Sequence, residues 1–280
     1  MQVRLGNQYL DLARPRVMGV LNVTPDSFSD GGDFIRRDDA LRRVTSMLKE
    51  GVDIIDIGGE STRPGAAEIP VQEEMDRVLP IIEAIGGTSD VVISIDTSKA
   101  EVMREAVAAG ATLINDVFAL RREGALEAVR DLSAGVCLMH MLGTPGTMQD
   151  NPVYRAIPGD IMAFLEERVA ACGAAGIDRD RLIIDPGFGF GKTDTHNLQL
   201  LSRLQELSAL KLPVLVGISR KRTLGSLTGR GPKERVAAGV AVAVLAVERG
   251  AHIVRTHDVA ATVDALRLVA ATAAAGRVDD

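Results

Sequence analysis

Short apolar runs alternate with amphipathic segments along most of the chain. Eight of these runs are nearly continuous rather than alternating, which is typical of parallel strands that are buried on both faces. The pattern predicts strands at 17–23, 52–57, 91–96, 112–117, 135–141, 181–185, 213–218 and 251–256.

Between these runs, apolar residues recur at the helical spacing of three and four positions. The first such stripe follows Asp38 and Asp39, which are candidate caps, and the sixth includes residues 200–207. Pro232 predicts the start of the seventh helix, whose Ala, Val and Gly content indicates that it is largely buried. Asp258 is the candidate cap of the last helix.

Eight strand–helix units in tandem predict a (β/α)₈ TIM barrel. An open doubly wound sheet is the alternative, because periodicity alone does not close a barrel. Barrels of this kind often form one domain of about 250 residues, so the 280 residues fit a single domain spanning 1–280. Residues 1–14 fall outside the repeat and are expected to form a short N-terminal hairpin extension.

Composition and charge exclude several classes of protein. The chain is 46% apolar and 25% charged, which argues against disorder, and its net charge of −6 argues against a nucleic-acid partner. Its longest run of apolar residues and glycine, 236–247, covers 12 residues and is too short to span a membrane. Two cysteines, Cys137 and Cys172, suit a reducing compartment. Since no secretory signal is recognisable either, we expect a cytoplasmic protein.

Long connections follow several predicted strands, and polar residues gather where those strands end. In a barrel these ends meet at one rim, where active sites lie. A single polar residue there could simply cap a helix or pin a loop, but seven on one rim favour a binding site. They are Asn22, Asp96, Asn115, Asp185, Ser219, Arg255 and His257.

Common catalytic motifs do not fit. The glycine-rich segment 187–193 lacks the first glycine of a phosphate-binding loop, because Pro186 occupies that position. The segment 217–221 lacks the final glycine of a nucleophile elbow, since Lys221 stands there. The four histidines do not have zinc-site spacing. Neither a covalent nucleophile nor a structural metal is indicated.

Several segments nevertheless resemble one family, in unbroken order over roughly residues 15–275. They include Met18-Gly-Val-Leu-Asn22-Val-Thr-Pro-Asp-Ser-Phe-Ser-Asp-Gly-Gly32, Asp56-Ile-Gly-Gly-Glu60-Ser-Thr-Arg-Pro-Gly65, Ser94-Ile-Asp96-Thr-Ser-Lys99, Asp185-Pro-Gly-Phe-Gly-Phe-Gly-Lys192, Gly217-Ile-Ser219-Arg-Lys221 and Arg255-Thr-His257-Asp258. Together they are similar to the dihydropteroate synthase family, whose fold is the (β/α)₈ barrel.

The resemblance implies a reaction in folate biosynthesis. In this family, 6-hydroxymethyl-7,8-dihydropterin diphosphate condenses with 4-aminobenzoate to give 7,8-dihydropteroate and diphosphate. An SN1-like path, in which diphosphate leaves first, is implied, with Mg²⁺ as the cofactor. A homodimer and binding of sulfonamide inhibitors are also implied.

The resemblance assigns roles to particular residues. It implies that the pterin is bound by Asp96, Asn115, Met139, Asp185, Phe190 and Lys221, although core packing remains an alternative role for Met139. It implies that the diphosphate is bound by Asn22, Arg63, Arg255 and His257, with Asn22 also coordinating Mg²⁺. It implies that 4-aminobenzoate is bound by Phe28, Thr62, Arg63, Pro64, Phe190 and Ser219. The catalytic group would be Asp96, Lys221, Arg255 and His257.

Two alternatives remain at this point. For Arg255, the alternative to a diphosphate ligand is a buried salt bridge across the barrel with Asp185 or Asp96. For the whole chain, other pterin-binding barrels include methyltransferases that act on methyltetrahydrofolate with a corrinoid partner, and a paralogue could bind pterin without forming product. Against the first, the cobalamin signature is incomplete, since Gln199 stands where its glycine belongs.

Overall fold

The computed structural model describes residues 1–24, 33–62 and 65–276. Eight parallel strands form its main sheet: β3 (Arg16–Asn22), β4 (Ile54–Gly58), β5 (Val92–Asp96), β6 (Leu113–Asp116), β7 (Gly135–Met139), β8 (Leu182–Asp185), β9 (Leu215–Val216) and β10 (Ile253–Thr256). They are arranged in the order β8-β7-β6-β5-β4-β3-β10-β9. A parallel bridge from Ile184 to Val214 joins the two edge strands, so the predicted barrel is confirmed over the open sheet.

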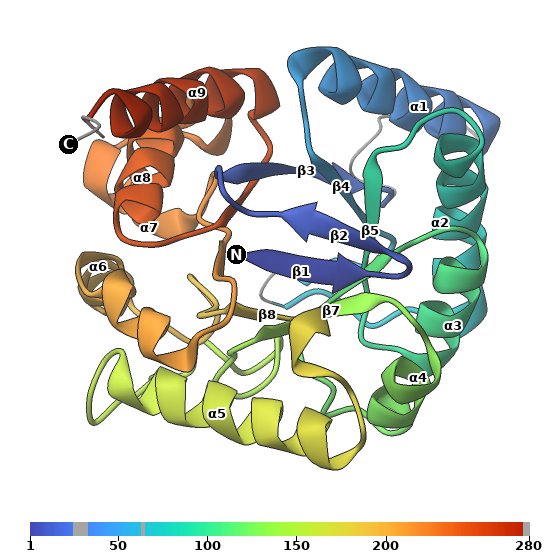
Figure 1. The fold of residues 1–280 in the computed structure, drawn as a ribbon, viewed down its shortest axis with the longest axis horizontal. Coiled ribbons are helices and arrows are strands. Elements are labelled where there is room, and N and C mark those ends of the chain that lie inside the picture. Colours follow the sequence, from blue (N-terminus) through green and yellow to red (C-terminus); the bar gives the residue numbers. More distant parts are fainter. Residues whose placement is uncertain (25–32, 63–64, 277–280) are drawn as a thin grey trace.

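A ring of helices surrounds the sheet (Figure 1). The α-helices in the described part of the chain are α1 (Asp33–Glu50), α2 (Val71–Gly86), α3 (Ala100–Ala108), α4 (Ala125–Asp131), α5 (Gly159–Ala174), α6 (Asp194–Ser202), α7 (Arg222–Thr228), α8 (Val236–Glu248) and α9 (Val259–Ala275). The largest apolar cluster fills the layer between these helices and the strands.

Two predicted helices are wrong in their bounds, and one helix was not predicted. The sixth helix ends at Ser202, and Leu204–Leu210 form a 3₁₀ helix instead. A short helix, α7, occupies part of the connection expected between Ser219 and Pro232. Pro232 begins a 3₁₀ turn, and α8 starts only at Val236.

The predicted burial of the seventh helix is also wrong within this chain. In α8, Ala243 and Ala246 are the buried residues, and Leu245 is 40% exposed. The helix therefore presents apolar side chains away from the barrel, although its composition suggested a core element.

The predicted caps are also incorrect. Asp38 and Asp39 lie inside α1 rather than before it, because that helix already begins at Asp33. Asp258 precedes α9, but its carboxylate makes no capping hydrogen bond and pairs with Arg220.

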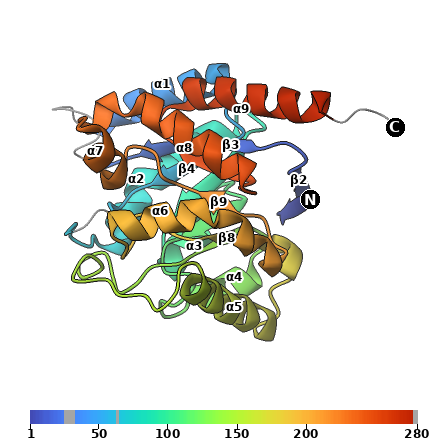
Figure 2. The same ribbon diagram turned by 90° about the vertical axis from the view of Figure 1, so that its left-hand side faces the viewer.

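The predicted hairpin is confirmed and closes one end of the barrel. Strands β1 (Gln2–Leu5) and β2 (Gln8–Asp11) pair antiparallel, and Val3 and Leu5 pack on the apolar inner layer of the barrel strands. A Cβ atom on Gly135 would lie 2.5 Å from Leu5 Cδ2, so glycine is needed for this close approach. Figure 2 shows the hairpin at one end of the barrel, which leaves the opposite end for the site.

Within residues 1–24, 33–62 and 65–276, no helix is long and apolar enough to cross a membrane.

Candidate active site

Inward-facing positions of the barrel change from apolar to polar along the strands. The apolar layer beneath the hairpin includes Ile54, Leu113, Ile183 and Ile253. Side chains two positions apart on a strand point to the same face. Two residues further along these four strands lie Asp56, Asn115, Asp185 and Arg255. The fold thus brings predicted site residues together at the end of the barrel opposite the hairpin.

Arg255 lies between two carboxylates from other strands. Its Nε donates to Asp56 Oδ2 at 2.6 Å, and its Nη2 donates to Asp96 Oδ2 at 2.7 Å. Burial opposes the positive charge, but the two carboxylates outweigh it and raise the pKa of Arg255. The salt-bridge alternative is therefore observed, with Asp96 as an expected partner and Asp56 as an unexpected one. A diphosphate role remains compatible with it, because 21% of the Arg255 side chain is exposed.

Asp96 retains an acceptor for a ligand. Its Oδ1 is buried and has no hydrogen-bond partner among the described residues. Burial raises the pKa of Asp96 to about 7, with Arg255 opposing the shift and Asp56 adding to it. An unsatisfied buried acceptor is costly, so an N–H donor of a ligand would be bound favourably at this oxygen.

Asp56 is a site residue to which the sequence analysis assigned no role. It is fully buried and accepts hydrogen bonds from Ser94 Oγ at 2.6 Å, Asn115 Nδ2 at 3.1 Å and Arg255 Nε. One carboxylate thereby orients both the amide and the guanidinium of the predicted site. The signal was available in the sequence, because a lone aspartate interrupts the apolar residues of β4.

Asp185 and Lys221 form a second charged part of the site. Asp185 Oδ1 accepts the backbone N–H of Gly187 at 2.7 Å, and burial raises the pKa of Asp185 while the charge of Lys221 partly offsets this. Lys221 Nζ donates to the carbonyl of Phe188 and lies 4.5 Å from the ring centre of Phe190. Burial lowers the pKa of Lys221 to about 8, although Asp185 opposes the shift.

Met139 and Phe190 belong to a small apolar cluster that is separate from the main core. Val117, Met139, Met141 and Met148 are its buried members, and Phe190 packs against it. Met139 is the register partner of Asp185 on the neighbouring strand. Met139 therefore packs at the charged end of the barrel rather than in the apolar layer beneath the helices. This position favours a ligand-binding role for Met139 over core packing.

The other described rim residues lie close to these groups. Asn22 and Asp96 flank Gly58 in the strand register, and a Cβ atom on Gly58 would lie 3.8 Å from Asn22 Oδ1 and from Asp96 Oδ2. Ser219 Oγ accepts the backbone N–H of His257 at 3.2 Å and lies 3.2 Å from its Nδ1. These positions bring together the ends of β3, β4 and β5, and the hydrogen bond joins the connections that follow β9 and β10.

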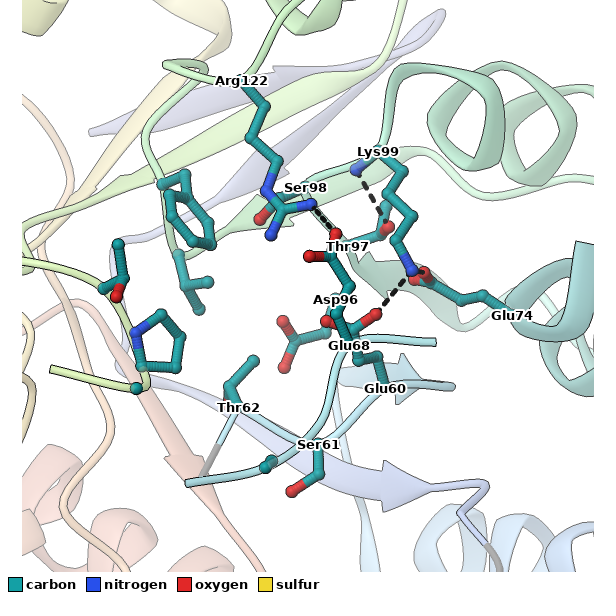
Figure 3. Close-up of a pocket in the computed structure, with 16 residues that line it drawn as sticks. Glu60, Ser61, Thr62, Glu68, Glu74, Asp96, Thr97, Ser98, Lys99 and Arg122 are labelled. Atoms are coloured by element: carbon teal, nitrogen blue, oxygen red, sulfur yellow. Dashed lines mark hydrogen bonds and ion pairs between the residues drawn. The ribbon is translucent and has the colours of Figure 1, made fainter. Parts of the chain in front are cut away.

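Three predicted residues, Phe28, Arg63 and Pro64, lie outside the described residues, so their roles stay predictions. Thr62 is described and lines a cavity of about 290 Å³ over the connections that follow β4 to β7 (Figure 3). Asp96 and Val117 also line it, whereas Asp185 and Lys221 are not among its lining residues. The cavity therefore adjoins the charged end of the barrel rather than covering all of it.

A buried ion cluster supports one wall of this cavity. In Figure 3, Lys99 reaches between Glu60 and Glu74. Its Nζ also donates to the carbonyl of Ile69 at 2.6 Å. Glu60 and Ile69 bracket the connection that carries Thr62, so Lys99 fixes both of its ends.

Among residues 1–24, 33–62 and 65–276, no group of three or more acidic, histidine or cysteine side chains is arranged to hold a metal ion. Asn22, the predicted ligand, is a neutral amide. Such a donor fits Mg²⁺ only where the substrate supplies most of the oxygens, and phosphates commonly do so.

Comparison with known proteins decides the family. The pterin binding enzyme family matches residues 18–257. The chain belongs to this family. It is 52% identical over 266 residues to the dihydropteroate synthase of Escherichia coli, covering 95% of this chain and 94% of that one. This similarity confirms the predicted resemblance of the chain to the dihydropteroate synthase family.

Solved pterin-binding enzymes have the same fold. The Yersinia pestis dihydropteroate synthase in complex with a sulfonamide drug is 51% identical, with a TM-score of 0.94, and the match covers 98% of this chain and 100% of that one. The Xanthomonas albilineans enzyme with 4-aminobenzoic acid is 53% identical, with a TM-score of 0.92 and coverage of 98% and 99%. The latter enzyme is also known in complex with 7,8-dihydropteroate, at a TM-score of 0.87, 46% identity and 98% coverage of both chains.

Proposed function

We propose that this chain is a dihydropteroate synthase, which joins 6-hydroxymethyl-7,8-dihydropterin diphosphate to 4-aminobenzoate and releases diphosphate. The observation that carries the proposal is the grouping of Asp96, Asn115, Asp185, Lys221 and Arg255 at one end of the barrel. The identity of about half of all residues to named dihydropteroate synthases supports the same reaction.

The pterin would bind between the two charged parts of the site. A reduced pterin presents adjacent N–H donors on its 2-amino-4-oxo edge, and a carboxylate accepts such a pair in bidentate fashion. Asp185 would accept from this edge, while Asn115 and the unpaired oxygen of Asp96 would bind the remaining ring nitrogens. Met139 and Phe190 would contact the ring, and Lys221 would exchange its carbonyl partner for the pterin.

The diphosphate would bind at Arg255, with Asn22, Arg63 and His257 around it. The guanidinium offers a planar fork of donors that matches phosphate oxygens. Asn22 would supply one amide oxygen to a Mg²⁺ ion that the diphosphate oxygens otherwise hold. When bound, the ion neutralises part of the charge that develops on the leaving group.

We infer an SN1-like reaction in which the bond from the pterin methylene to the diphosphate oxygen breaks first. Asp96, as a carboxylate, would stabilise the resulting cation, because it lies in the same charged cluster as Arg255. The amino group of 4-aminobenzoate then forms the carbon–nitrogen bond and loses a proton. Phe28, Thr62, Arg63, Pro64, Phe190 and Ser219 would bind the aminobenzoate and exclude water, which would otherwise trap the cation. A sulfonamide would compete for these residues.

A product assay tests the proposal. The purified chain is mixed with dihydropterin diphosphate, 4-aminobenzoate and Mg²⁺, and dihydropteroate and released diphosphate are measured by mass spectrometry. We expect both products in equal amounts. Binding of the diphosphate substrate without product would instead favour the pterin-binding paralogue, and absence of binding would refute both readings.

We also propose that a second copy of the chain covers the outer face of α8. Apolar surface of this kind usually marks an interface, and Leu245 on α8 and Leu268 on α9 are 40% and 69% exposed. Light scattering at micromolar concentration is expected to give the mass of a homodimer, and Leu245→Arg to lower it. A monomeric mass for the unmodified chain would refute this assembly.

A further inference from the structure

Side-chain hydrogen bonds hold the loop that follows Asp185 along its whole length. Gly187, Gly189 and Gly191 have φ values of +70°, +79° and +63°, so the chain alternates through a conformation that ordinary residues avoid and forms no regular element. Each of the five successive carbonyls from Gly187 to Gly191 accepts a side-chain hydrogen bond. In chain order, the donors are Lys192, Lys221, Gln149, Lys192 and Tyr154.

Lys192 supplies two of these five bonds. Its side chain is fully buried, and its Nζ donates to the carbonyls of Gly187 at 2.8 Å and Phe190 at 3.2 Å. The third partner is Nδ1 of His140, at 2.9 Å. A lysine amine can form three hydrogen bonds, so these partners satisfy it completely. Burial lowers the pKa of Lys192 well below that of an ordinary lysine. None of the three is a carboxylate, which distinguishes Lys192 from a residue of an ion pair.

His140 is suited to the role of a neutral acceptor. Burial, together with the charge of Lys192, lowers the pKa of His140 to about 2, so the imidazole stays uncharged at neutral pH. Its backbone N–H donates to the carbonyl of Asp185 at 2.9 Å. The edge of its ring packs against Phe164, with ring centres 5.0 Å apart. His140 therefore connects the anchor of Lys192 to the strand end that carries Asp185.

The loop is pressed closely against this anchor. A Cβ atom on Gly187 would lie 1.8 Å from the carbonyl oxygen of His140, and one on Gly191 would lie 2.8 Å from that of Leu142. Lys192 thus connects Gly187 with Phe190. Gly187 donates to the Asp185 carboxylate, and the ring of Phe190 faces Lys221 Nζ. Two of the five side-chain hydrogen bonds to the loop therefore come from one amine, and they tie Gly187 and Phe190 to the same point.

We propose that Lys192 is a positioning residue for pterin recognition, which fixes the loop 187–191 so that Phe190 and Lys221 face Asp185. The inference rests on the proposed function, because the pterin is the ligand whose binding it would control. Lys192 itself would not touch the ligand. It acts through the backbone carbonyls of Gly187 and Phe190.

Lys192→Met tests the proposal, and Arg181→Met is the matched control. Arg181 is also a buried basic residue, is 4% exposed, and donates to the backbone carbonyls of Ala134 and Val129. It lies immediately before β8, whereas Asp185 ends that strand, so it serves the hairpin end of the barrel. Both variants lose a buried basic side chain that donates to main-chain oxygens, but only Lys192 holds the loop 187–191.

The measurement is the Kd of 6-hydroxymethyl-7,8-dihydropterin diphosphate without 4-aminobenzoate, by calorimetry well below the unfolding temperature of each variant. We expect both variants to unfold at lower temperature, Lys192→Met to raise the Kd at least tenfold, and Arg181→Met to change it less than twofold. Equal Kd values for Lys192→Met and the unmodified chain would overturn the inference, as would equal losses in both variants.

Two further results keep the test decisive. If Lys192→Met does not fold, Tyr154→Phe replaces it, because this variant loses only the hydrogen bond to the carbonyl of Gly191. The loss of one such bond is expected to raise the Kd about threefold. A Kd unchanged in Tyr154→Phe would then overturn the role of loop anchoring. If the unmodified chain itself does not bind the diphosphate substrate, the proposed function fails, independently of Lys192.

Discussion

Asp56→Asn probes the electrostatic coupling at the centre of the site. Asp96 has a pKa of about 7 because it is buried, and the neighbouring charge of Asp56 contributes to this elevation. If the ionised Asp96 is the form that binds the pterin and stabilises the cation, kcat/KM falls as the pH falls through 7. Replacing Asp56 by the isosteric amide removes one negative charge, and it also leaves Arg255 to interact with Asp96 alone. Both changes favour the ionised form of Asp96. The fall of kcat/KM on the acid side of its pH profile, the acid limb, therefore moves to lower pH.

The size of this effect follows from the ionised fraction. With a pKa near 7, roughly one tenth of Asp96 is ionised at pH 6 and roughly nine tenths at pH 8, so kcat/KM drops about tenfold between these values. A downward shift of one unit corresponds to about 1.4 kcal/mol, a modest interaction for charges this close. It would leave about half of Asp96 ionised at pH 6, and the drop from pH 8 would shrink to about twofold.

The assay is initial-rate dihydropteroate formation from pH 5.5 to 8.5 at subsaturating pterin substrate. Ionisation of the diphosphate is identical for all variants and cancels in the comparison. Asp96→Asn is the control, since it is expected to be slow at every pH and to lack the acid limb. An acid limb at the same pH in Asp56→Asn and the unmodified chain would refute the reasoning, and so would an acid limb that persists in Asp96→Asn.

Four more substitutions test the site and the packing of the fold around it. Asp185→Ala is expected to weaken pterin binding at least a hundredfold, because a charged bidentate contact is lost; tight binding in calorimetry would contradict this anchor. Arg255→Ala is expected to weaken the diphosphate substrate at least tenfold more than the free pterin alcohol, with equal losses as the opposing result. It also leaves Asp56 and Asp96 without their partner, so urea denaturation is expected to show a loss of about 3–5 kcal/mol in the free energy of unfolding. Gly187→Ala is expected to destabilise the fold strongly in the same assay, because its Cβ would lie 1.8 Å from a carbonyl oxygen. Gly239→Ala meets no atom within 4 Å and is expected to stabilise α8 by about 0.5–1 kcal/mol. Similar free energies of unfolding for the two variants would show that the chain relaxes the close approach at Gly187.

Much of the barrel was predictable because a parallel strand buried on both faces needs a nearly continuous apolar run. The same feature made the polar residues at strand ends conspicuous, as with Asn115 and Asp185. Helix α7 was missed because its seven residues, with glycine at position 225, carry too little apolar periodicity to be distinguished from a loop. The burial of α8 was misjudged for another reason. The amino-acid composition of α8 predicts that its apolar surface is buried. It does not predict whether this chain or a second copy of the chain would bury that surface.

Asp56 shows where sequence reasoning lost information that the fold restores. Its partner Arg255 is 199 positions away, and the two meet only because β10 lies beside β3 and β3 beside β4. An aspartate inside an apolar strand could be recognised as unusual, but its partners depend on the closure of the barrel and the register of three strands. Because Asp56 also accepts the amide of Asn115, it connects the residues expected to bind the diphosphate with those expected to bind the pterin. Asp56→Asn should therefore weaken binding of the free pterin alcohol and, by a larger factor, of the diphosphate substrate; equal losses for both ligands in calorimetry would mean that Asp56 does not couple the two halves.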